Sequence, residues 1–121
     1  MKELPNISGA ELEVMQVLWK ADKPMKIQEV CDGLKHSDWK YNTVGTLLLR
    51  MSDKGAVSSE KINRTIYYTP ILNEEDYKKM QTKQFIQKLY NGSVKELAVS
   101  LFKSEDMTED DIDEIRKMFD L

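Results

Sequence analysis

The stretch NTVGTLLLRMSDKG, residues 42–55, determines the architecture of this chain most directly. Its apolar residues recur at i, i+3, i+4 and i+7, the spacing that places them on one side of a helix: Val44, Leu47, Leu48 and Met51. Gly55 follows as the residue that commonly ends a helix in the left-handed conformation. The stretch therefore predicts a helix over about Asn42 to Lys54 with one side in the core.

The opposite side of this predicted helix carries short polar side chains and one arginine, with no carboxylate before Asp53: Asn42, Thr43, Gly45, Thr46 and Arg50. A helix side that only faces solvent normally mixes Glu and Lys at i, i+4 spacing. Asn can bond adenine, Thr can contact a thymine methyl group or a phosphate, and Arg reaches guanine or phosphate. The composition of this side favours DNA contact over simple exposure.

Two helices are predicted before this stretch. Ser8 and Glu11 form a capping-box pattern that begins a helix ending near Ala21. Its apolar positions are Leu12, Met15, Leu18 and Trp19, whereas Glu11, Glu13, Gln16 and Lys20 are expected to face elsewhere. A second helix is expected over about Lys26 to Lys35, with no good N-cap and with Ile27, Val30, Cys31 and Leu34 buried.

A hairpin is predicted after Gly55. The runs 56–60 and 65–70 are rich in residues that favour strands, and they flank a tip that carries Lys61 and Arg64. Three helices followed by a basic-tipped hairpin is the order of a winged helix-turn-helix, in which the third helix enters the major groove and the wing lies along the backbone or minor groove. The predicted fold class is therefore mainly α with a small β-hairpin, with this domain over residues 1–72.

Residues 73–121 are predicted to form three short amphipathic helices, which begin near Asn73, Ser93 and Thr108. So small a segment cannot make a sound core alone, so it packs on the first domain or on a copy of itself. We favour a helical dimerisation domain, because a groove-reading domain gains affinity from two symmetric half-sites. The alternative is that these helices complete a monomeric domain. The predicted dimerisation residues are Tyr77, Ile86, Leu89, Tyr90, Leu97, Leu101, Phe102, Ile112 and Ile115.

The distribution of charge permits nucleic-acid binding although the whole chain is mildly acidic. The formal charge is −3 over 121 residues, with +1 in residues 1–72 and −4 in residues 73–121. Residues 35–72, which include the third helix and the hairpin, carry +3. Because screening limits interactions to roughly 10 Å, a polyanion responds to such a local patch rather than to the average.

The composition argues against several other classes of protein. The sequence has one cysteine, Cys31, and one histidine, His36, so an internal disulfide and a Cys/His zinc site are excluded. It also offers few residues that could form an enzyme active site. We therefore expect no enzymatic activity and no cofactor. No run approaches the roughly 20 apolar residues of a membrane span, and no apolar segment follows Lys2 and Glu3, so a cytoplasmic protein is expected.

Several motifs together resemble the penicillinase-repressor family of the BlaI/MecI/CopY type. They are Ser8-x-x-Glu11, Thr43-Val44-x-Thr46-Leu47-x-x-Arg50, Lys54-Gly55, Tyr67-Tyr68, and Leu89-Tyr90-Asn91-Gly92 followed by Leu97. The resemblance implies a homodimeric transcriptional repressor that binds a palindromic operator, with groove contacts from Asn42, Thr43, Gly45, Thr46 and Arg50. The alternative is a winged helix used as a protein-protein interaction module without sequence-specific DNA binding.

This sequence departs from the family pattern in three ways. At Gly45 some antibiotic-responsive members carry a longer polar or basic side chain. The C-terminal Cys-x-Cys pair of the copper-responsive branch is missing, so metal sensing by that route is not expected. In the antibiotic-responsive branch a membrane-bound sensor protease leads to cleavage at an Asn-Phe bond, and the matching residues here are Ser100 and Leu101.

Overall fold

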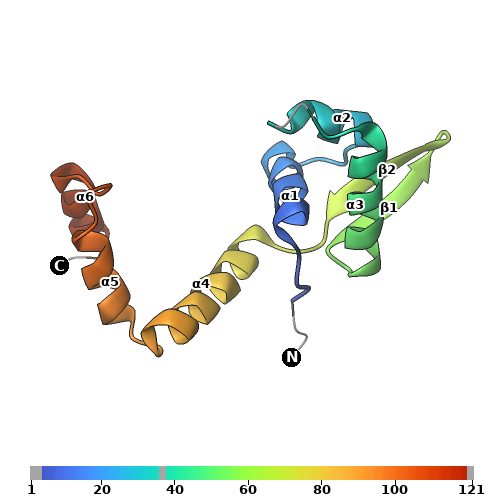
Figure 1. The fold of residues 1–121 in the computed structure, drawn as a ribbon. Coiled ribbons are helices and arrows are strands. Elements are labelled where there is room, and N and C mark those ends of the chain that lie inside the picture. The colour runs from blue at the N-terminus through green and yellow to red at the C-terminus, as the bar shows by residue number, and fades with distance from the viewer. Residues whose placement is uncertain (1–3, 36–37, 120–121) are drawn as a thin grey trace. The chain divides into compact units, whose positions relative to one another are not determined.

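Within residues 4–35 and 38–119, which the computed structural model describes, the chain forms six helices and one antiparallel hairpin (Figure 1). The contacts divide it into two units, Met1–Tyr77 and Lys78–Leu121. His36 lies outside the described residues. None of the described helices is long and apolar enough to cross a membrane.

Helix α1 spans Gly9–Ala21 and begins with the predicted capping box. The Glu11 N–H donates to Ser8 Oγ at 3.2 Å, and the Ser8 N–H donates to Glu11 Oε1 at 2.8 Å. The apolar side of the helix is buried as expected at Met15 and Leu18. The expectation that Glu11 faces away from the core is wrong, because its side chain is 0% exposed. Cationic side chains from a later helix make this burial tolerable, as described below.

Helix α2 spans Ile27–Gly33 and is shorter than the predicted 26–35. It ends at Gly33, where an added Cβ would lie only 2.7 Å from Val17 Cγ1, so the glycine allows α2 to approach α1 closely. The predicted lack of a side-chain cap from Lys26 is confirmed. The Glu29 carboxylate compensates in part by accepting the Lys26 N–H at 3.1 Å.

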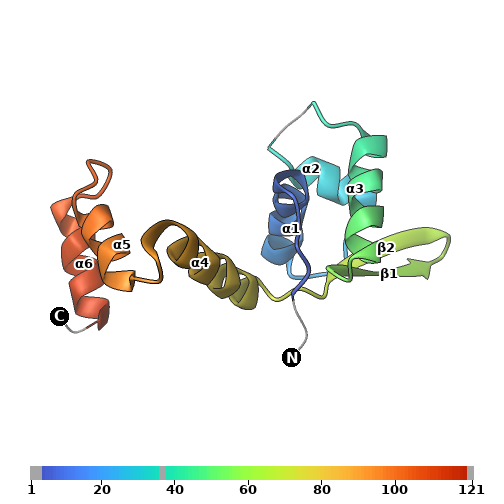
Figure 2. The ribbon, with the colours of Figure 1, turned by 60° about the horizontal axis from the view of Figure 1, so that its bottom comes forward.

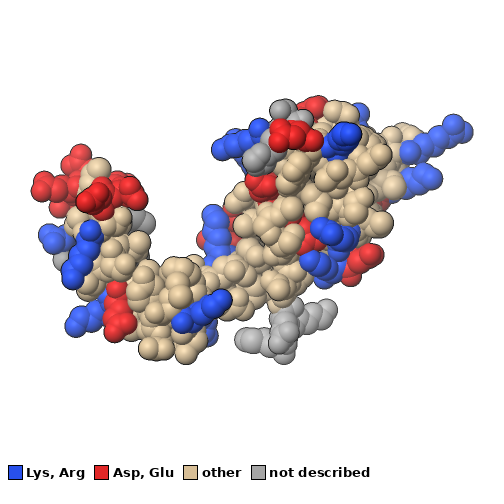
Figure 3. Space-filling model, in the orientation of Figure 1, with Lys and Arg blue, Asp and Glu red and all other residues tan. Residues whose placement is uncertain are grey.

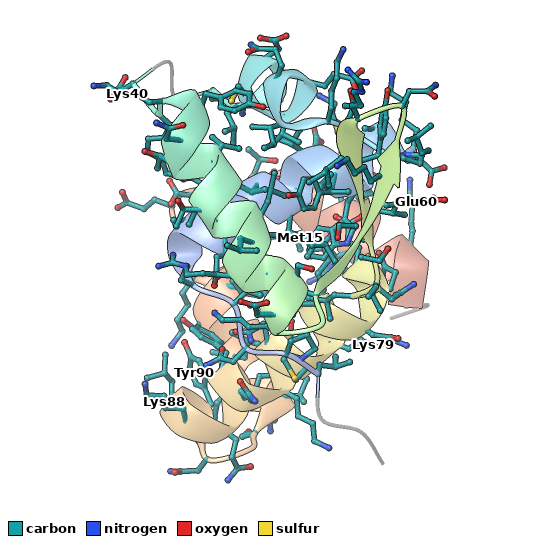
Figure 4. The ribbon with its side chains drawn as sticks, turned by 90° about the vertical axis from the view of Figure 1, so that its right-hand side faces the viewer. Met15, Lys40, Glu60, Lys79, Lys88 and Tyr90 are labelled. Atoms are coloured by element: carbon teal, nitrogen blue, oxygen red, sulfur yellow. The ribbon has the colours of Figure 1, made fainter. Side chains whose placement is uncertain are left out.

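Helix α3 spans Tyr41–Asp53 and packs against α1 and α2. Its predicted buried stripe is confirmed at Val44, Leu47, Leu48 and Met51. In Figure 4, which looks onto α3, Met15 lies behind this helix at the centre of the domain. The core thus holds one side of α3 and leaves its other side at the surface.

The hairpin consists of β1 (Val57–Ile62) and β2 (Thr65–Pro70), paired antiparallel. Ile62 pairs with Thr65, which leaves a turn of only two residues, Asn63 and Arg64. The tip is therefore tighter than the four-residue connection expected from the sequence, and Lys61 belongs to the strand. Asn63 and Arg64 have φ values of 50° and 71°, and positive φ at both central residues is the geometry of a type I′ turn.

A short bridge ties the hairpin to the connection between α1 and α2. The Met25 N–H donates to the Tyr68 carbonyl at 2.9 Å, and the Tyr68 N–H donates to the Met25 carbonyl at 2.7 Å. Both side chains are buried. The base of the hairpin is thus held by backbone hydrogen bonds as well as by the core.

Three further helices follow, α4 (Glu74–Tyr90), α5 (Val94–Phe102) and α6 (Glu109–Phe119). They begin close to the predicted starts, and the side chains of Asn73, Ser93 and Thr108 cap them by accepting the N–H groups of Asp76, Glu96 and Asp111. The first turn of α4 belongs to the first unit. There Trp19 Nε1 donates to the Leu72 carbonyl at 2.8 Å, and the rings of Trp19 and Tyr77 lie 6.1 Å apart.

Candidate nucleic-acid interface

The surface side of α3 presents short polar side chains. Asn42, Thr43 and Thr46 are all exposed. Thr46 Oγ1 donates to the Asn42 carbonyl at 2.9 Å, one helical turn earlier, which holds this side chain close to the helix. A side built in this way lets another molecule approach the backbone of α3 closely.

Gly45 differs from these neighbours because it lies against α2. A Cβ added at this position would meet Ile27 Cδ1 at 3.5 Å, an ordinary van der Waals distance. The residue is half-buried, and the side of its Cα that would carry a side chain faces Ile27. Position 45 therefore belongs to the contact between the two helices that make the helix-turn-helix.

Arg50 lies between solvent and a buried carboxylate. Its side chain is 56% exposed, yet its Nε atom lies 3.8 Å from Glu11 Oε2. Lys54, at the C-cap that ends α3, places its Nζ atom 2.5 Å from Glu11 Oε1. The sequence predicted Arg50 as a candidate DNA contact and did not predict its pairing with Glu11.

Lys54 and the capping box explain how Glu11 stays charged inside the domain. Burial by itself would raise the pKa of this carboxyl group, but the hydrogen bond from Lys54, the backbone hydrogen bond from Ser8 and the Lys54 charge outweigh it. The pKa of Glu11 is therefore lower than its ordinary value. Glu11 thus joins the start of α1 to the end of α3.

Two exposed residues of α3 were missed by the sequence analysis. Tyr41 and Leu49 are 54% and 60% exposed, respectively. Leu49 lies three residues after Thr46 and so continues the same exposed side. The exposure of Leu49 could have been predicted, because it lies outside the i, i+3, i+4, i+7 pattern of the buried stripe. An apolar residue outside that pattern must face solvent or a partner.

The hairpin supplies the basic part of the surface. Lys61 and Arg64 are both exposed. Figure 1 and Figure 2 show the hairpin tip extending beyond the helices of its own unit, and Figure 3 shows Lys and Arg atoms gathered there. Lys61 pairs across the hairpin with Ile66, which is also exposed. The tip thus combines two positive charges with apolar side chains at the end of a projecting arm.

The two parts of this surface suit different parts of a DNA duplex. Short polar side chains on an exposed helix can reach base edges in a major groove, and cations on a projecting hairpin can contact phosphates. Among residues 4–35 and 38–119, no three His, Cys, Asp or Glu side chains gather in a way that could hold a metal ion. The exposed polar side of α3 and the cations of the hairpin are the features of this surface that favour contact with a polyanion.

Several predicted dimerisation residues come together in the second unit. Leu97, Leu101, Phe102 and Ile115 line one apolar groove of about 250 Å³ between α5 and α6. The other predicted dimerisation residues differ from one another in exposure to solvent. Leu89 is exposed, Tyr90 and Ile112 are half-buried and Ile86 is buried, whereas Tyr77 packs on Trp19 in the first unit.

Ser100, of the predicted cleavage pair, is exposed within α5, and its Oγ lies 3.3 Å from the Tyr90 hydroxyl.

Comparison with known proteins gives consistent matches over nearly the whole chain. Residues 7–120 match the penicillinase repressor family. The penicillinase repressor of Bacillus licheniformis is 32% identical over 120 residues, covering 99% of this chain and 94% of that protein. The methicillin resistance regulatory protein MecI of Staphylococcus aureus strain N315 is 31% identical over 112 residues, covering 93% and 91%.

Two solved structures resemble the chain in both fold and sequence. The DNA-binding domain of the repressor BlaI is 44% identical with a TM-score of 0.53, covering 64% of this chain and 94% of that one. The monomeric form of Bacillus licheniformis BlaI, in complex with the blaP half-operator, is 46% identical with a TM-score of 0.53 and the same coverage.

Proposed function

We propose the function of this chain from its family: the chain belongs to the penicillinase repressor family, and it is a DNA-binding transcriptional repressor with a winged-helix domain. The observation that carries this function is the exposed side of α3, which has no carboxylate from Asn42 to Arg50 and shares its domain with a basic hairpin. The similar BlaI structure that is bound to a half-operator supports the same conclusion.

We further propose how the first unit meets its operator. Helix α3 enters the major groove, where Asn42, Thr43 and Thr46 face base edges. Arg50 lies at the far end of the same side and reaches a phosphate or a guanine. Lys61 and Arg64 on the hairpin contact the backbone beside the groove. Gly45 lies at the contact of α3 with Ile27 of α2, so in this proposal it helps to position α3 and makes no base contact of its own.

The second unit is proposed to form a homodimer. Large apolar side chains that remain partly exposed to solvent are frequent there: Phe85, Leu89, Val94, Val99, Leu101 and Phe102. Their area is better buried against a second copy than left in water, since burial contributes about 25 cal/mol per Å². A two-fold dimer would present two α3 helices to a palindromic operator. Tyr77 is left out of this proposed interface because its ring already packs on Trp19.

We propose that repression is relieved in the cytoplasm by proteolysis between Ser100 and Leu101, through a pathway with a membrane sensor protease, as the family resemblance implies. This bond lies inside α5. A protease binds an extended chain, so cleavage requires that α5 first opens locally. No catalytic activity of its own and no cofactor are proposed for this chain.

The decisive experiment is selection of duplexes from a randomised DNA pool by the full chain, followed by titration of the enriched duplex. We expect enrichment of a palindromic sequence and weaker binding as salt rises, because phosphate contacts release counterions. Lys61→Gln should weaken binding, whereas the matched charge change Lys20→Gln on α1 should not. Absence of any enriched sequence at low salt would favour the alternative, a protein-protein interaction module.

A further inference from the structure

The carboxylate of Glu11 makes more contacts than the capping of α1 requires. It accepts the Ser8 N–H at the start of α1, and the same side chain meets Lys54 and Arg50 from α3. Arg50 and Lys54, the C-cap of α3, are four residues apart, and both side chains converge on one carboxylate. A capping box by itself would be satisfied by the Ser8 contacts alone.

The two oxygens of this carboxylate are unequal. Oε1 accepts hydrogen bonds from the Ser8 N–H and from Lys54 Nζ. Oε2 is buried and has no hydrogen-bond partner within the described part of the chain. The cation paired with it is Arg50, whose Nε lies 3.8 Å away, beyond hydrogen-bond length. A buried oxygen without a donor is costly, so Oε2 attracts the Arg50 guanidinium.

Glu11 is also a fixed anchor, unlike its partners. It is 0% exposed and is held at both the backbone and the side chain by the capping box. Arg50 is 56% exposed and Lys54 is 39% exposed. The carboxylate therefore cannot follow Arg50 toward solvent. It restricts an otherwise flexible arginine, most of which remains accessible to another molecule.

We propose that Glu11 is a positioning residue for operator binding, which orders the Arg50 side chain at the DNA-facing side of α3 before the DNA arrives. This inference rests on the proposed function, since it assigns a partner to Arg50 in the reading of the operator. The Arg50 side chain then loses its conformational entropy when the protein folds rather than when the DNA binds. A competing role, in which Glu11 withholds Arg50 and Lys54 from DNA, predicts the opposite effect of its removal.

The test uses full-length Glu11→Gln, Arg50→Gln and the double variant, titrated with the enriched duplex between about 50 and 200 mM salt. Arg50→Gln should weaken binding and lower the salt slope by about one. Glu11→Gln should weaken binding in the same direction, and the double variant should bind no more weakly than Arg50→Gln. Ser8→Ala, which removes the cap but keeps the carboxylate, should lower the melting temperature and leave the salt slope unchanged. Tighter binding by Glu11→Gln, or additive losses in the double variant, would overturn the proposal.

A second measurement needs only the unmodified protein without DNA. Nitrogen relaxation of the arginine Nε–H groups should show Arg50 more ordered than Arg64, whose side chain is also exposed. Equal mobility of the two side chains would contradict the proposal even if Glu11→Gln failed to fold. If the unmodified chain bound no duplex, the proposed function would fail, and this measurement would still decide whether Glu11 orders Arg50.

Discussion

Replacing Arg64 with glycine should make the protein more stable and a weaker DNA binder. Arg64 occupies the second position of the two-residue turn with φ at 71°, where a side chain is disfavoured. The left-handed conformation costs a residue with a Cβ about 1–2 kcal/mol, whereas glycine adopts it freely. Glycine also gains freedom in the unfolded chain, which offsets about 0.5–1 kcal/mol. Arg64→Gly should therefore stabilise the domain by about 0.5–1 kcal/mol, or a few degrees in melting temperature.

The same change removes one positive charge from the hairpin tip. If Arg64 contacts a phosphate, the salt slope of binding should fall by about 0.9. A slope of that size corresponds to about an eightfold loss of affinity at 0.1 M salt, relative to 1 M salt where counterion release contributes little. Stability and affinity should thus change in opposite directions on a single substitution.

Two matched variants separate strain from charge. Arg64→Ala keeps the strained turn and removes the charge, so it should lose affinity without gaining stability. Arg64→Lys keeps both and should resemble the unmodified protein in both measurements. The assays are thermal unfolding and titration of the enriched duplex. An unchanged melting temperature for Arg64→Gly would refute the strain argument, and an unchanged salt slope would refute the phosphate contact.

Three further outcomes follow from the packing and charge of the first unit. Gly45→Ala should raise the free energy of unfolding by about 1 kcal/mol, because alanine favours helices and its Cβ fits beside Ile27. The affinity for the operator should not change, and a loss of affinity would show that position 45 faces DNA. Gly33→Ala should lower the free energy of unfolding by about 1–3 kcal/mol, because the alanine Cβ would lie 2.7 Å from Val17 Cγ1. An unchanged melting temperature would contradict this close approach of α2 to α1. The pKa of Glu11 is lowered in the folded state, so its charge stabilises the protein above the unfolded pKa of about 4.3, and this contribution is lost as pH falls through the lower folded pKa. Urea unfolding from neutral to acidic pH should therefore show a steeper loss for the unmodified protein than for Glu11→Gln, and parallel curves would contradict the assignment.

Periodicity and capping were enough to predict most of the first unit. The burial of Val44 and Met51 follows from spacing alone, and the Ser8 capping box follows from local chemistry. These features depend on residues close together in the chain. The same reasoning predicted which side of α3 faces outward, because the residues left over from the buried stripe must lie there.

Features that depend on distant residues could not be predicted in this way. Glu11 was expected at the surface because a carboxylate is rarely buried, and its partners lie 39 and 43 positions later in the chain. The contact of Gly45 with Ile27 depends on how two helices cross. The tight turn at Asn63 and Arg64 was missed because arginine is a poor residue for positive φ.

The bridge between Met25 and Tyr68 fixes the position of the hairpin within the domain. Two backbone hydrogen bonds join the hairpin base to the segment that enters α2, and α2 packs on α3. The hairpin therefore cannot slide along a duplex independently of α3. Phosphates recur regularly along a duplex, so the proposed contacts of the hairpin with the backbone need no particular base pairs beneath it. We therefore expect the hairpin to meet the backbone at one fixed distance from the bases that α3 contacts, and changing the base pairs beneath the hairpin should leave its contribution to affinity unchanged.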